Sequence, residues 1–88
     1  MARYQILYWQ DIPAQLRAFD DRKPINRPLP PVFQEEIDRL AMEEGLFGTD
    51  DYLEQWRWSE KRERPGTAAE VLDALEREIR EQFDHLDK

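Results

Sequence analysis

Cysteine is absent from this 88-residue sequence, histidine occurs once, glycine occurs three times, and no long uninterrupted hydrophobic run is present. The lack of cysteine excludes disulfides and thiolate metal ligands, so a domain of this size must depend on side-chain packing for its stability. Three separated glycines cannot build a glycine-rich phosphate loop. Without a hydrophobic run we expect neither a membrane span nor an export signal, and we expect a cytoplasmic protein.

Hydrophobic residues form 40% of the chain and aromatic residues 11%, which is enough apolar surface for a folded protein. At 88 residues we expect a single domain over 1–88. The net charge of −7 disfavours nucleic acid and anionic membranes as partners. The acidity is concentrated, because residues 31–45 hold five acidic residues against one basic residue, and residues 67–88 hold seven against three.

The first part of the chain predicts a β-hairpin. Residues 3–9 are rich in strand-forming aromatic and β-branched types. Residues 14–20 alternate, so that Leu16 and Ala18 share one face while Arg17 and Phe19 share the other. A helix over 14–20 is the competing interpretation, since its residues are also good helix formers.

The remainder predicts a connector, two helices and a third strand. Four prolines make 21–31 an extended connector. A helix follows from Pro31, with apolar residues on one face, and ends at Gly45. Residues 52–64 predict a strand, which a short helical turn near Thr49 can precede. A capping box at Thr67 and Glu70 begins a last amphipathic helix that continues to the C-terminus along Val71, Leu72, Leu75, Ile79, Phe83 and Leu86.

These elements predict an α+β fold in the order β-β-α-β-α, in which a small antiparallel sheet of about three strands is backed by two amphipathic helices. A mostly helical domain with one hairpin is the alternative.

No recognisable catalytic set is present, and we expect no enzyme activity, no cofactor and no metal site. The single histidine, His85, lies near the C-terminus and suits a helix end better than a metal site. Asp50 and Asp51 follow a turn, where capping explains them as well as cation binding does. A small metal-dependent subunit that uses Asp50, Asp51 and His85 remains an alternative.

The most informative group of residues is aromatic and basic. If the helices cover the sheet face that bears Ile6, the opposite face presents Trp9, Arg17 and Phe19, with Arg57 or the pair Trp56 and Trp58 beside them. Such a face resembles a binding platform, although any of these rings can instead close the core. The predicted partner-binding residues are Trp9, Arg17, Phe19, Trp56, Arg57 and Trp58.

The chain resembles a known family along nearly its whole length. The segments that carry the resemblance are 2–9, 11–15, 33–38 and 45–53, together with Trp56. They look like the small bacterial "virulence factor" domain family, for which no biochemical activity or catalytic residue is assigned. The resemblance implies a bacterial cytoplasmic protein with a non-catalytic accessory role.

We therefore expect a protein-interaction or accessory module whose partner is another protein or a second copy of the chain, which would make a homodimer. Trp, Phe and Arg dominate interface hot spots, and the proposed face concentrates all three. Single-stranded nucleic acid stacking on the same rings is the alternative, and the net charge opposes it.

Overall fold

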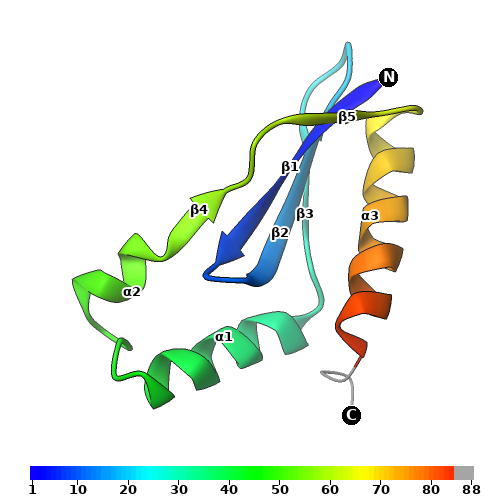
Figure 1. The fold of residues 1–88 in the computed structure, drawn as a ribbon. Coiled ribbons are helices and arrows are strands. Elements are labelled where there is room, and N and C mark those ends of the chain that lie inside the picture. The colour runs from blue at the N-terminus through cyan, green and yellow to red at the C-terminus, as the bar shows by residue number, and fades with distance from the viewer. Residues whose placement is uncertain (85–88) are drawn as a thin grey trace.

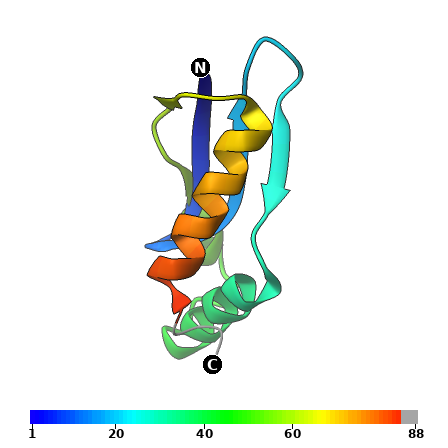
Figure 2. The ribbon, with the colours of Figure 1, turned by 90° about the vertical axis from the view of Figure 1, so that its right-hand side faces the viewer.

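The computed structural model describes residues 1–84. Its elements in chain order are β1 (Ala2–Trp9), β2 (Ile12–Phe19), β3 (Ile25–Pro28), α1 (Pro31–Glu43), α2 (Asp50–Glu54), β4 (Trp56–Trp58), β5 (Arg62–Arg64) and α3 (Ala68–Gln82). The helix α3 lies across one face of the sheet, and α1 crosses the end at which β1 stops and β2 begins (Figures 1 and 2). The predicted α+β class with an antiparallel sheet is confirmed. The described residues contain five strands and three helices, so the expectation of about three strands and two helices was too low.

The centre of the sheet is the predicted hairpin. The strand order is β3-β2-β1-β4, and β5 also pairs with β1. Ile6 lies opposite Leu16, and Tyr4 lies opposite Ala18. Leu16 and Ala18 are fully buried, so the alternation in 14–20 places them toward the core; the helical alternative for this segment is wrong. Between Leu7 and Tyr8 the register shifts, because β2 carries one extra residue, Ala14, at a bulge.

Two segments differ from the sequence prediction. The predicted proline connector 21–31 contains β3, which pairs with β2. Prolines are compatible with this position because β3 is an edge strand. An edge strand uses only the backbone N–H groups that face its single neighbour, so a missing N–H on the outer side breaks no hydrogen bond of the sheet. The predicted strand 52–64 is divided into α2, β4 and β5. The helical turn expected near Thr49 is present, since the Thr49 side chain accepts a hydrogen bond from the Tyr52 amide and caps α2.

The first long helix begins and ends as its sequence predicts. Pro31 occupies the first turn of α1, where a missing N–H costs nothing. At the other end Gly45 has a φ of +71°, a left-handed conformation that suits glycine. The N–H groups of Gly45 and Leu46 donate to the carbonyls of Met42 and Ala41, so these two carbonyls in the last turn of α1 are satisfied.

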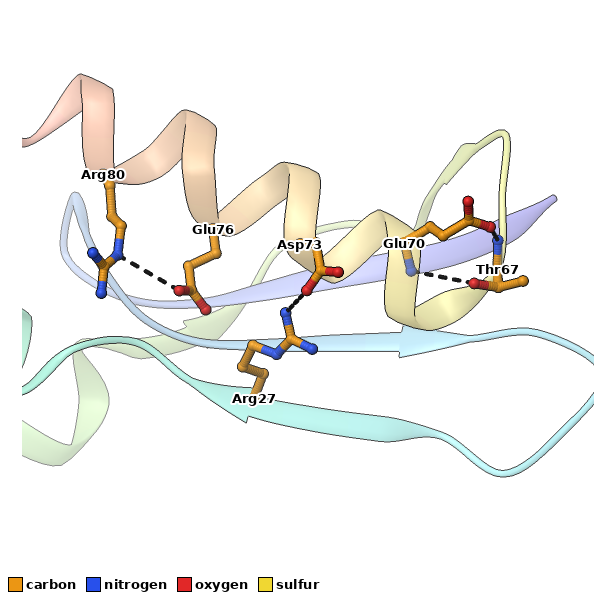
Figure 3. A network of polar contacts seen from close by, with 6 residues as sticks. All are labelled: Arg27, Thr67, Glu70, Asp73, Glu76 and Arg80. Carbon is orange, nitrogen blue, oxygen red and sulfur yellow. Dashed lines mark hydrogen bonds and ion pairs between the residues drawn. The ribbon is translucent and has the colours of Figure 1, made fainter.

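The predicted capping box of α3 is confirmed, because the Glu70 amide donates to the Thr67 hydroxyl and the Thr67 amide donates to the Glu70 carboxylate (Figure 3). The expected stripe is buried at Val71, Leu72, Leu75 and Ile79. The helix ends at Gln82, so the prediction that it continues through Phe83 to the C-terminus is wrong at Phe83, which is the C-cap. Leu86 lies outside the described residues.

Three polar contacts fasten α3 to the sheet. Asp20, directly after β2, accepts a hydrogen bond from the Ala68 amide at 3.0 Å. Arg27 of β3 reaches Asp73 on α3 (Figure 3). Arg64 of β5 donates through both terminal nitrogens to Glu78. The helix is thus held at both edges of the sheet as well as by its buried stripe.

None of the helices in residues 1–84 is both long and apolar enough to cross a lipid bilayer.

Candidate binding surface

The face of β1 and β2 turned away from α3 is the candidate site. Between Arg3 and Leu7 of β1 and between Gln15 and Phe19 of β2, its residues are partly or fully exposed and alternate with those of the covered face. Within residues 1–84 no helix lies over the middle of this face, and α2 lies beside the end of β1 only (Figure 1). We define the open face by these residues: Gln5, Leu7, Gln15, Arg17, Phe19, Trp58 and Lys61.

Arg17 is fixed in place by two contacts. Its guanidinium carbon lies 4.2 Å from the centroid of the Trp58 ring. Its Nε donates to the Asn26 side chain of β3 at 3.0 Å. Trp58 lies in β4 and pairs with Leu7 of β1, so the contact between Arg17 and Trp58 joins β2 to β4 over β1. A cation held over an indole ring in this way is restricted before any partner arrives.

Lys61 makes a similar contact on the same face, from the opposite edge of the sheet. It belongs to the link between β4 and β5, and its ammonium lies 5.3 Å from the centroid of the Phe19 ring in β2. The open face therefore carries two cations, each placed over an aromatic ring that comes from another part of the sheet.

Charged residues of both signs lie beside the Phe19 end of the open face. Arg3 of β1 lies opposite Phe19 and forms an ion pair of 3.6 Å with Glu63 of β5. Asp20 and Asp21 line a shallow depression together with these residues.

Trp9 does not contribute to this surface, and its predicted exposure is wrong. The side chain is 0% exposed. Its ring centroid lies 5.6 Å from that of Tyr52, and its indole N–H donates to the Tyr52 carbonyl at 3.0 Å. Because α2 covers the end of β1, Trp9 becomes part of the core instead of the platform.

The structure separates Trp56, Arg57 and Trp58. Trp56 packs edge-on against Tyr52 with centroids 6.2 Å apart, so it supports the α2 segment. Arg57 pairs with Tyr8 and points to the opposite face from its two neighbours, so its expected place beside the open face is wrong. A terminal guanidinium nitrogen of Arg57 lies 3.9 Å from a carboxylate oxygen of Asp11. Only Trp58 of the three joins Arg17 and Phe19.

The surroundings of Tyr8 are distinct from the open face. Burial raises the pKa of the Tyr8 phenol, and the neighbouring Tyr4 adds to the rise, while Arg62 and Arg57 act in the opposite direction. This side of the sheet faces α3 and is largely closed by packing.

Sequence reasoning missed Lys61, Asn26 and Ser59. Lys61 reads as a solvated residue of an edge strand, and only the break between β4 and β5 turns it toward Phe19. Asn26 lies in a stretch whose prolines conceal a strand. Ser59 accepts a hydrogen bond from the Ile6 amide and so holds β4 against β1. None of the three has a local sequence signal, because each role depends on a distant strand.

The other candidate residues do not assemble into a site. Asp50 and Asp51 are exposed in the first turn of α2, where acidic side chains favour a helix N-terminus. His85 lies outside the described residues. Among residues 1–84 no three acidic or histidine side chains converge in a way that could hold a metal ion.

A depression of about 500 Å³ lies beside the N-terminus of α3, between the turn after β2 and the start of the helix. Its principal polar groups are already engaged. Asp20 accepts from the amides of Ala68 and Arg22, and these bonds lower the pKa of its carboxyl. Thr67 and Glu70 bond each other, so these side chains cap α3.

Fold and surface together define a small two-layer α+β domain with one uncovered sheet face. The family model described as "Virulence factor" matches residues 7–87, so the chain belongs to this family, as the resemblance of its sequence predicts. No curated protein and no solved structure matches the chain.

Proposed function

We propose that this protein is a non-catalytic interaction module that binds a partner protein through the open face. The observation that carries the proposal is the pair of cation and ring contacts, Arg17 over Trp58 and Lys61 over Phe19, on a sheet face that no helix of residues 1–84 covers at its middle. Tryptophan and arginine are the residue types most enriched in interface hot spots. Side chains that are already restricted lose less entropy when a partner binds.

The alternative of single-stranded nucleic acid binding has weaker support. Stacking requires an accessible ring face, and Arg17 occupies one face of Trp58 while Lys61 occupies one face of Phe19. The net charge of −7 adds repulsion against a phosphate backbone.

Site-specific photocross-linking tests the proposal. A benzophenone amino acid at Gln15 lies on the open face, whereas the same group at the exposed Arg77 lies on α3 and serves as the control. In extracts of the native cell we expect Gln15 to cross-link one discrete protein, or a second copy of the chain, and Arg77 not to do so. The cross-link should be lost in Trp58→Ala and Phe19→Ala variants whose circular dichroism is unchanged.

Equal cross-linking from both positions, or a cross-link that persists in both alanine variants, would show that the open face is not the binding surface.

A further inference from the structure

The acidic and basic residues of this protein occupy different sides. Residues 31–45 hold five acidic residues against one basic, and residues 67–84 hold six against two. These segments contain α1 and α3, which lie at the end of the sheet and on its covered face (Figure 2). The open face instead carries Arg17 and Lys61, and its adjacent pair Arg3 and Glu63 is neutral. The two cations of the open face therefore lie on other elements than the acidic helices.

Both cations lack a carboxylate partner within the part of the chain that the structure describes. The ion pairs there involve Arg3, Arg27, Arg39, Arg57, Arg64 and Arg80. Arg17 uses Nε for Asn26, which leaves the N–H groups of its two terminal nitrogens for a ligand. Those groups match the two oxygens of a carboxylate in a bidentate arrangement.

The two cationic groups lie at different levels along β1. Arg17 pairs with Gln5 of β1, and its guanidinium lies over the ring of Trp58, which pairs with Leu7. The Lys61 ammonium lies over Phe19, which pairs with Arg3 of β1. The side-chain amide of Gln5 donates to the Ser59 carbonyl.

We infer that the open face binds an extended acidic segment of the partner protein, in which carboxylates and an apolar side chain share one face of the segment. In an extended chain, residues i, i+2 and i+4 share one face. Two carboxylates on that face then meet Arg17 and Lys61, and the apolar residue on the same face contacts the partly exposed rings and Leu7. This inference rests on the proposed function and names the chemistry of the partner.

The test uses the whole chain and three fluorescent probes: repeats of Glu-Ser-Leu-Ser-Glu, repeats of Lys-Ser-Leu-Ser-Lys, and a single-stranded oligothymidylate. We expect the acidic peptide alone to raise the fluorescence anisotropy. Its affinity should fall as the salt concentration rises from roughly 0.05 M to 0.3 M, because screening weakens contacts between exposed charges.

The variant Arg17→Glu with Lys61→Glu should weaken binding of the acidic peptide at least about tenfold, because attraction becomes repulsion at both contacts. The matched control is Arg22→Glu with Lys23→Glu, which changes the net charge equally on the exposed turn before β3. It should change the affinity by less than about twofold, since distant surface charges are screened. If the first variant loses its circular dichroism spectrum, the neutral pair Arg17→Gln with Lys61→Gln replaces it, and the same ordering is expected.

No binding of the acidic peptide, equal losses in both charge variants, or preferential binding of the basic peptide or the oligonucleotide would each overturn the inference. Failure here remains distinct from failure of the proposed function. If Gln15 cross-links a partner that the acidic peptide does not displace, the open face is an interface but its partner is not an acidic segment.

Discussion

Trp9 is the residue on which the end of the sheet depends. It is fully buried, and its single polar atom is satisfied by the Tyr52 carbonyl. Burial of an indole supplies a large apolar area, and its N–H must find a partner when water is excluded. Trp9 therefore joins β1 to the α2 segment through both packing and a hydrogen bond.

Replacement of Trp9 by alanine should lower the free energy of unfolding by about 3–5 kcal/mol, because it leaves a cavity among fixed neighbours. Trp58→Ala is the control on the same sheet. It removes a partly exposed ring and one contact with a cation, for a loss of about 0.5–2 kcal/mol. Urea unfolding followed by circular dichroism measures both, and equal losses would contradict the assignment of Trp9 to the core and Trp58 to the surface.

At the scale of elements, β4 and β5 together form the edge of the sheet next to β1, and Ser59 lies in the link between them. The Ser59 amide donates to the Ile6 carbonyl at 2.8 Å, and its hydroxyl accepts from the Ile6 amide at 2.9 Å. The hydroxyl thereby takes the place of a strand carbonyl where the ladder is interrupted. A short, broken edge also offers little backbone for pairing with another chain.

Ser59→Ala should leave the Ile6 amide without this acceptor and cost about 1–3 kcal/mol. Hydrogen exchange measured by NMR should show faster exchange at the Ile6 amide. Amides within α3 should accelerate only as much as the loss of global stability predicts. Ser59→Thr keeps a hydroxyl and is the control. Unchanged protection of Ile6 in the alanine variant would mean that the hydroxyl does not hold this edge.

The elements that the sequence predicts best are those with local signals. The alternation in 14–20, Pro31, Gly45 and the capping box of Thr67 each specify a conformation within a few residues, and each is confirmed. β3 and the division of 52–64 were not predicted. Their strands are only three or four residues long and are stabilised by pairing with residues that lie far away in the sequence.

At the scale of the whole molecule, carboxylates hold α3 at its start and along its length. Hydrogen bonds from the Ala68 and Arg22 amides lower the pKa of Asp20 below 3.8. The Thr67 amide lowers the pKa of Glu70 below 4.5, and the Arg64 guanidinium lowers that of Glu78 below the same value. The helix that these carboxylates hold lies over the face of the sheet opposite the open face (Figure 2).

Stability should therefore decrease in acid. A carboxyl with a lowered pKa in the folded state stabilises the fold above its unfolded pKa, and the contribution is lost as the pH falls through the folded pKa. We expect the melting temperature to fall below about pH 4.5, the ordinary pKa of Glu70 and Glu78. The Asp20→Ala variant removes one such group. The difference in melting temperature between this variant and the native chain should be largest near neutral pH and should disappear as the pH falls below 3.8.

Asp21→Ala is the control, because Asp21 is an exposed neighbour on the same turn. Its effect on the melting temperature should be small and should not follow this pH pattern. A difference between native protein and Asp20→Ala that stays constant from neutral pH to pH 3 would contradict a role of the ionised Asp20 carboxylate in holding α3.

The sequence alone determined the absence of disulfides, the α+β class, the family, both ends of α1 and the start of α3. Those features depend on composition or on residues close together in the chain. Only the tertiary structure decided which tryptophan is core and which is surface. Trp9, Trp56 and Trp58 have the same chemistry, and their roles differ because α2 covers the end of β1 and leaves Trp58 beneath Arg17. The candidate surface arises in the same way, since its cations and rings come from strands that meet only in the folded sheet.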